Sequence, residues 1–176
     1  MSTYQPGYFT SCELLNITEF GDITTSQSRI ARQIISASIA PFSEQIEYRY
    51  RYFPDLKKTE SLLAAIALEA ARKQHKFQLM YNALLSLPTI NTLTLLKLAS
   101  TLELIQHKFI PDLLCDHIHT IIKSDWLEGT NLCLTQAPAL FVNGHRFHGK
   151  FTNAKLNPFV SFHLEQSRKS SFVTNN

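Results

Sequence analysis

The sequence predicts an α/β protein in which an open sheet carries helices on both sides and a helical block is inserted in the middle of the chain. Two short segments rich in β-forming residues, 13–20 and 46–53, enclose a helical pattern near the N-terminus. Helical periodicity then dominates about seventy residues by our boundary assignment. Near the C-terminus, Asn143-Gly144 joins two further apolar segments in the strongest short hairpin signal. This order of elements indicates a mixed sheet.

Size and composition restrict the class of protein. The 176 residues suit one domain with a substantial core, and 44% hydrophobic with 18% charged residues excludes a disordered chain. No apolar run reaches the ~20 residues of a membrane span. The N-terminus lacks a basic start followed by an apolar stretch, so we expect a cytoplasmic protein without a membrane partner. A net charge of +3, spread along the chain without a basic stripe, predicts no nucleic-acid partner.

The N-terminal third is expected to form a strand, a helix and a second strand. The first strand covers 13–20, "ELLNITEF", and ends at a turn. The helix that follows, "SRIARQIISASIA", has apolar residues at helical spacing, with Ser26 or Ser28 as its cap, and stops at Pro41. The segment 46–53, "IEYRYRYF", alternates apolar and charged residues, which is typical of a strand.

The middle of the chain is expected to be helical throughout. One long helix covers 61–87, where apolar residues keep a period near 3.6, and Pro88 closes it. A shorter helix follows in "TLTLLKLASTLEL". A third helix opens at Ile110-Pro111 and ends at Gly129, because proline suits a first helical turn and glycine suits a helix C-terminus.

The C-terminal part returns to strands and ends in a helix. The stretch "ALFVNGHRFHG" predicts the hairpin, and Asn157-Pro158 is expected to cap a last helix, "PFVSFHLEQ". The polar tail over 168–176 is expected to be flexible.

Four stretches together carry a resemblance to a known family. They are "EFGDITTSQSR", "YRYRYFP", "LLAAIALEAARKQHKFQLMYNALL" and "DWLEGTNLCLTQAPALFVNGHRFHG". In this order they resemble the DsbA-like thiol-disulfide oxidoreductases of the thioredoxin superfamily, over roughly residues 13–166. The resemblance implies a thioredoxin-like fold in one unit, 1–176. Its thioredoxin-fold part covers 13–55 and 130–167, and its helical insertion covers 56–129.

The resemblance also locates a site, and this chain departs from the family there. The family carries Cys-x-x-Cys at the first helical turn, and the two cysteine positions fall on Thr25 and Ser28, with Ser26 and Gln27 between them. The family also has a cis proline before the hairpin strands, which Pro138 matches. Ala137 precedes it, whereas the family usually has Thr or Val.

Hydroxyls cannot perform the family's thiol chemistry. A helix N-terminus lowers a thiol pKa from about 8.5 by several units, but an alcohol starts near ~15, so the same shift leaves it protonated. Disulfide exchange also requires sulfur to attack sulfur. We therefore expect a redox-inactive protein without a cofactor, which retains a groove for an extended peptide or a small ligand such as glutathione at Thr25, Ser28, Ala137 and Pro138. Whether any catalysis remains stays open.

Two enzyme alternatives stay open. Kappa-class glutathione transferases and 2-hydroxychromene-2-carboxylate isomerases share this plan and use a serine hydroxyl at the matching position, so Thr25 would donate to a glutathione thiolate. Those enzymes have a sequence similar to Ser-Pro-Tyr at the turn, whereas this chain has Thr25-Ser26-Gln27. The second alternative is an active oxidoreductase that works through Cys133, five positions before Pro138.

Other reactive or charged residues are given structural roles. The three cysteines, Cys12, Cys115 and Cys133, are odd in number and far apart, which predicts reduced, buried thiols. Cys115 and His119 are too few ligands for a structural metal site, so we expect no metal. The two arginines Arg29 and Arg32 are expected on a solvated face of the helix. Their alternative role is to attract an anionic ligand to the helix.

Overall fold

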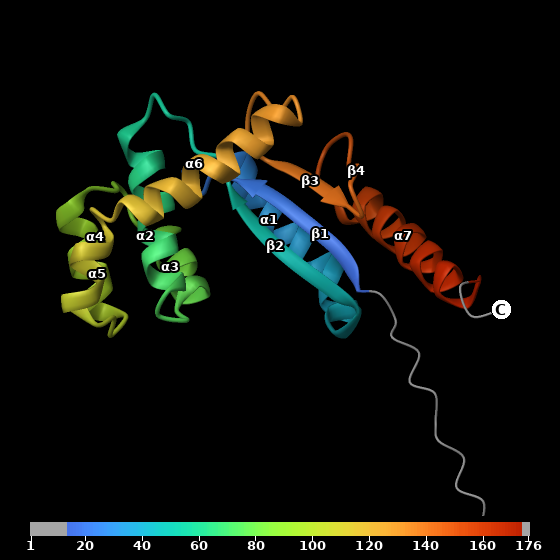
Figure 1. The fold of residues 1–176 in the computed structure, drawn as a ribbon, viewed down its shortest axis with the longest axis horizontal. Helices are drawn as coiled ribbons and strands as arrows, with labels where there is room; N and C mark the ends of the chain where they lie inside the picture. The colour runs from blue at the N-terminus through green and yellow to red at the C-terminus, as the bar shows by residue number, and fades with distance from the viewer. Residues whose placement is uncertain (1–13, 174–176) are drawn as a thin grey trace, which may run out of the picture.

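The computed structural model describes residues 14–173, with side chains up to Lys169, and confirms the predicted fold class (Figure 1). Its sheet is mixed and four-stranded, in the order β2-β1-β3-β4. Strand β1 is parallel to β2 and antiparallel to β3, which pairs antiparallel with β4. In chain order, the elements are β1 (Leu15–Gly21), α1 (Ser26–Ile39), the 3-10 helix η1 (Ala40–Gln45), β2 (Ile46–Tyr52), α2 (Thr59–Arg72), α3 (Phe77–Leu84), α4 (Thr92–Thr101), α5 (Gln106–Asp112), α6 (Asp116–Asn131), β3 (Ala139–Val142), β4 (His145–Arg146) and α7 (Asn153–Val173).

Both faces of the sheet are buried, because successive side chains along a strand point to opposite faces and each face packs against its own core. Leu15 and Ile17 of β1 face one core, which Leu140 of β3 shares with side chains of α1 and α7. Phe20 of β1 and Phe141 of β3 point the other way, into a smaller core under α6. Helix α6 accordingly crosses one end of the sheet, while α7 lies beside α1 (Figure 1). None of the described helices combines the length and apolar character of a membrane span.

The long helix predicted over 61–87 is wrong, because two helices, α2 and α3, replace it. His75 takes a left-handed backbone with φ of 58°, and the backbone N–H of Lys76 donates to the carbonyl of Ala71 at 2.9 Å. This geometry ends a helix. Periodicity missed the break because both helices turn their apolar residues toward one shared core.

The third helix predicted from Pro111 to Gly129 is also two helices, α5 and α6. Pro111 lies inside α5, and α6 begins at Asp116 and ends at Asn131. Gly129 serves close packing instead of helix termination. A β-carbon there would lie 2.6 Å from the ring of Phe53.

The last helix starts earlier and ends later than predicted. Helix α7 begins at Asn153, so Pro158 lies within it and does not open it. It extends to Val173, through most of the segment 168–176 for which the sequence predicts a tail. Residues 174–176 lie outside the described residues.

Replacing Gly129 by Ala is expected to lower the free energy of unfolding by about 1–3 kcal/mol, because the new methyl group forces the Phe53 ring out of position. Chemical denaturation monitored by circular dichroism measures this. Ser124→Ala, on an exposed position of the same helix, is the matched control and should change stability by less than about 0.5 kcal/mol. Equal stability of the two variants would contradict the close approach.

Candidate functional site

The N-cap of helix α1, at the turn that follows β1, is Thr25 and not Ser26 or Ser28 as predicted. Thr25 has extended backbone angles, φ −93° and ψ 137°, and its hydroxyl accepts from the backbone N–H of Ser28 at 3.3 Å. The cap comes earlier because the N–H of Thr25 already donates to the carbonyl of Asp22 at 3.0 Å, which closes the turn. Ser26 is exposed.

The hydroxyls of Thr25 and Ser28 form a closed network. Their oxygens lie 2.9 Å apart, and the Thr25 hydroxyl reaches the carbonyl of Asp22 at 3.0 Å. Ser28 Oγ also accepts from the Asp22 N–H at 3.2 Å. As a donor the Thr25 hydroxyl reaches both Ser28 Oγ and the Asp22 carbonyl, so its proton is engaged within the turn. The two positions that carry sulfur in the family therefore stabilise the turn here.

The carboxylate of Asp22 ties this turn to the start of the helical block. It accepts from the backbone N–H of Thr24 at 3.0 Å and from that residue's hydroxyl at 2.7 Å. Its other oxygen accepts from the Ser61 hydroxyl at 2.6 Å and from the Asp55 N–H at 3.3 Å. Asp22 is buried, so these bonds replace water around its oxygens.

Three of the four predicted ligand-binding residues line one groove, which has a volume of about 590 Å³. They are Thr25, Ala137 and Pro138, and the Ala137–Pro138 peptide bond is cis. Ser28 is buried and is absent from the groove lining. The segments 53–58 and 134–138 and parts of α6 complete the walls.

The groove has an aromatic wall and unpaired backbone groups beside it. The rings of Phe53 and Trp126 stack with centroids 6.0 Å apart and an angle of 11°. Within the described residues, the backbone of 135–137 forms no hydrogen bond with other backbone groups. Lys57 and Lys58 are exposed lining residues. The groove can therefore contact apolar side chains, backbone groups and carboxylates.

The described cysteines do not belong to this groove. Cys133 is exposed, with φ of 58°, and is not among the lining residues, although the next residue, Leu134, is. The expectation of a buried thiol is wrong for Cys133, because it follows α6 in the left-handed turn that ends the helix. Cys115 is half-buried, and Cys12 lies outside the described residues. No cluster of three or more potential metal ligands occurs within residues 14–173.

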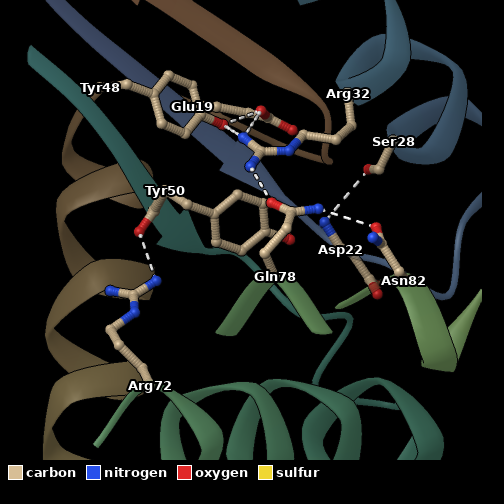
Figure 2. A network of polar contacts seen from close by, with 9 residues as sticks. All are labelled: Glu19, Asp22, Ser28, Arg32, Tyr48, Tyr50, Arg72, Gln78 and Asn82. Atoms are coloured by element: carbon tan, nitrogen blue, oxygen red, sulfur yellow. Dashed lines mark hydrogen bonds and ion pairs between the residues drawn. The ribbon is translucent and has the colours of Figure 1, made fainter. Parts of the chain in front are cut away.

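Sequence patterns did not identify one buried acidic residue of β1, which does not line the groove. Glu19 of β1 is fully buried, and its Oε2 accepts from the Tyr48 hydroxyl and from Arg32, at 3.2 Å for the guanidinium (Figure 2). Burial raises the pKa of Glu19 to about 7, although Arg32 opposes the shift. The signal was available, because Glu19 continues the inward-facing alternation of Leu15 and Ile17.

The two arginines expected on a solvated face instead hold the core together. Arg29 donates to the carbonyls of Ile23 at 2.7 Å and Leu85 at 3.2 Å. Arg32 pairs with Glu19 and stacks over the Tyr48 ring, 4.6 Å from its centroid. Neither interaction is visible from spacing along the helix, since the partners lie on other elements.

Comparisons place this geometry among known proteins. The family model described as thioredoxin matches residues 24–161. No curated protein matches the chain. A thioredoxin-like oxidoreductase from Silicibacter pomeroyi DSS-3 is similar in structure, with a TM-score of 0.75 and 20% identity over 91% of this chain and 90% of that one. The thiol-disulfide exchange protein alpha-DsbA2 from Wolbachia pipientis has a TM-score of 0.73 and 20% sequence identity, over 86% of this chain and 83% of that one. Oxidised BdbD from Bacillus subtilis has a TM-score of 0.70 and 13% sequence identity, over 86% of this chain and 88% of that one.

Proposed function

Because this chain belongs to the thioredoxin family and has the fold of DsbA-like thiol-disulfide oxidoreductases, we propose that it is a member that has lost dithiol chemistry and binds an extended peptide. The observation that carries the proposal is the closed hydroxyl network of Thr25 and Ser28 at the edge of the groove. Oxygen forms no mixed disulfide, so these residues support the turn without exchanging electrons.

Peptide binding follows from the groove's free backbone and its aromatic wall. The carbonyl and N–H groups of 135–137 are available to pair with an added extended segment, within the part of the chain that the structure describes. The stacked rings of Phe53 and Trp126 offer apolar contact to a side chain of that segment. Backbone pairing supplies affinity without a particular sequence, so the expected ligand is an unfolded or extended chain.

Glutathione is the competing ligand, because it also pairs with backbone beside a cis proline in related enzymes. For Thr25 to donate to its thiolate, the Thr25 hydroxyl must leave the carbonyl of Asp22, which keeps its bond from the Thr25 N–H. That rearrangement leaves no buried acceptor unsatisfied. A direct binding test therefore has to separate the two ligands.

The purified protein is expected to reduce insulin with dithiothreitol no faster than the uncatalysed reaction, since no described residue lining the groove carries a thiol. Turbidity of the precipitating insulin B chain measures the rate. Cys133→Ser is the matched variant and should behave identically. Activity that disappears in Cys133→Ser would overturn the proposed inactivity and identify Cys133 as a working thiol.

Binding can be followed through Trp126, the one tryptophan of the chain, which lines the groove. Titration with carboxymethylated insulin B chain is expected to shift its fluorescence, whereas glutathione at about 10 mM is expected to leave it unchanged. Thr25→Val, which removes the hydroxyl but keeps the shape, should retain peptide binding. Glutathione binding that Thr25→Val abolishes would favour the transferase alternative, and no response to the peptide would refute the peptide groove.

A further inference from the structure

A second pocket lies along β2, and it shares no lining residue with the groove. Its volume is about 600 Å³. Three aromatic side chains line it together with four arginines, namely Arg32, Arg49, Arg51 and Arg72, and we call it the arginine pocket. We propose that the arginine pocket binds a small phosphate-bearing anion, such as a diphosphate group.

The charge of the lining is one-sided. None of the pocket's lining residues carries a carboxylate. Arg51 is held from one side by Asp125 at 2.6 Å and by Glu128 at 3.4 Å. Arg49 donates hydrogen bonds from its Nε and Nη2 to the carboxylate of Glu47. Arg32 and Arg72 are paired with Glu19 and Glu69, so each arginine of the lining has an acidic partner that is itself not among the lining residues.

Donors remain unused in this arrangement. Among the described residues, Nη1 of Arg49 and Nη1 of Arg72 have no hydrogen-bond partner. A guanidinium carries five N–H groups in a planar fork, which matches two oxygens of a phosphate. The pocket thus offers one free Nη1 from each of two arginines to an oxyanion.

The arginines are also positioned before any ligand arrives. The Arg32 guanidinium lies 4.6 Å from the centroid of the Tyr48 ring, and that of Arg72 lies 4.6 Å from the Phe77 centroid. Figure 2 shows Arg32 pointing to Glu19 and Tyr48, and Arg72 pointing to the backbone of Tyr50. Side chains fixed in this way lose little conformational entropy when they bind.

The edge of β2 favours a compact anion over an added peptide strand. β2 is an outer strand of the sheet, so its outward backbone groups would pair with any added strand. Two of these groups are already occupied. The Tyr50 carbonyl accepts from Arg72 at 3.5 Å, and the Tyr52 N–H donates to Asp125 at 3.0 Å. An extended peptide would have to displace both side chains, whereas a phosphate contacts only their free ends.

Isothermal titration calorimetry with inorganic pyrophosphate tests the proposal on the whole chain. In about 50 mM NaCl we expect saturable binding with a Kd below about 1 mM, which weakens as the salt concentration rises. ADP should bind at least as tightly as pyrophosphate, because it carries the same diphosphate. Arg49→Met removes an exposed arginine and should weaken binding about fivefold.

The control is Arg146→Met, which changes net charge equally at an exposed position outside the pocket. It should leave the pyrophosphate Kd within about twofold. Equal weakening by both variants would mean diffuse attraction and overturn the site, as would no binding at about 10 mM pyrophosphate. Tighter binding of a hepta-glutamate peptide than of pyrophosphate would overturn the choice of ligand.

Discussion

Replacing Arg32 by Met is expected to lower the free energy of unfolding by about 1 kcal/mol more at pH 8 than at pH 5.5, because at pH 8 the fully buried Glu19 carboxylate loses its cation and must take up a proton instead. The pKa of Glu19 is about 7, raised by burial from 4.5. Glu19 is therefore mostly ionised at pH 8 and mostly protonated at pH 5.5. A protonated carboxyl needs no cation, so the cost of the substitution should be clearly smaller at pH 5.5. Urea denaturation at the two pH values measures the difference.

Two further variants make this result specific. Arg49→Met breaks the exposed pair with Glu47 and should cost less than about 1 kcal/mol at either pH, because water already screens that pair. Glu19→Gln combined with Arg32→Met removes the buried charge and should abolish the additional loss at pH 8, so that its stability relative to Glu19→Gln no longer depends on pH. A cost for Arg32→Met that does not change with pH would mean that lost packing, and not an unpaired charge, destabilises the variant.

Introducing two cysteines, Thr25→Cys with Ser28→Cys, is expected to create disulfide reductase activity at least on the order of tenfold above background in the insulin assay. The two side-chain oxygens already lie 2.9 Å apart, and longer carbon–sulfur bonds bring paired sulfurs within bonding distance. The thiol introduced by Thr25→Cys would occupy the cap of α1, where free N–H groups and the helix dipole stabilise a thiolate. The groove beside Pro138 would hold the substrate chain.

The single variants are the controls, in a Cys133→Ser background that removes the exposed native thiol. Thr25→Cys alone can form a mixed disulfide but has no partner to release it, so turnover should stay at background. Ser28→Cys alone places its thiol at a buried position and should react slowly with thiol reagents. If mass spectrometry finds no internal disulfide in the oxidised double variant, the turn does not retain the geometry of the family's dithiol.

Local patterns were sufficient for much of the fold. Strand β1 follows from a run of β-forming residues before a turn, β2 from alternation, and the hairpin of β3 and β4 from the Asn143-Gly144 turn, all of which act between close neighbours in the chain. Breaks inside the helical block were missed. His75 ends a helix with neither glycine nor proline, in a left-handed conformation that local preference disfavours, while the helices on either side of it pack into one shared core.

The sequence by itself determined the fold class, the pair of hydroxyls at 25 and 28, and the absence of a dithiol at those positions, because these depend on residue type and on spacing over a few positions. Only the tertiary structure decided which charges pair and which cavities form. Arg51 meets Asp125, 74 positions away, and Thr25 shares a groove with Trp126 and Pro138. Such pairings are selected by burial and electrostatics between separate elements, and no neighbour in the chain carries that information.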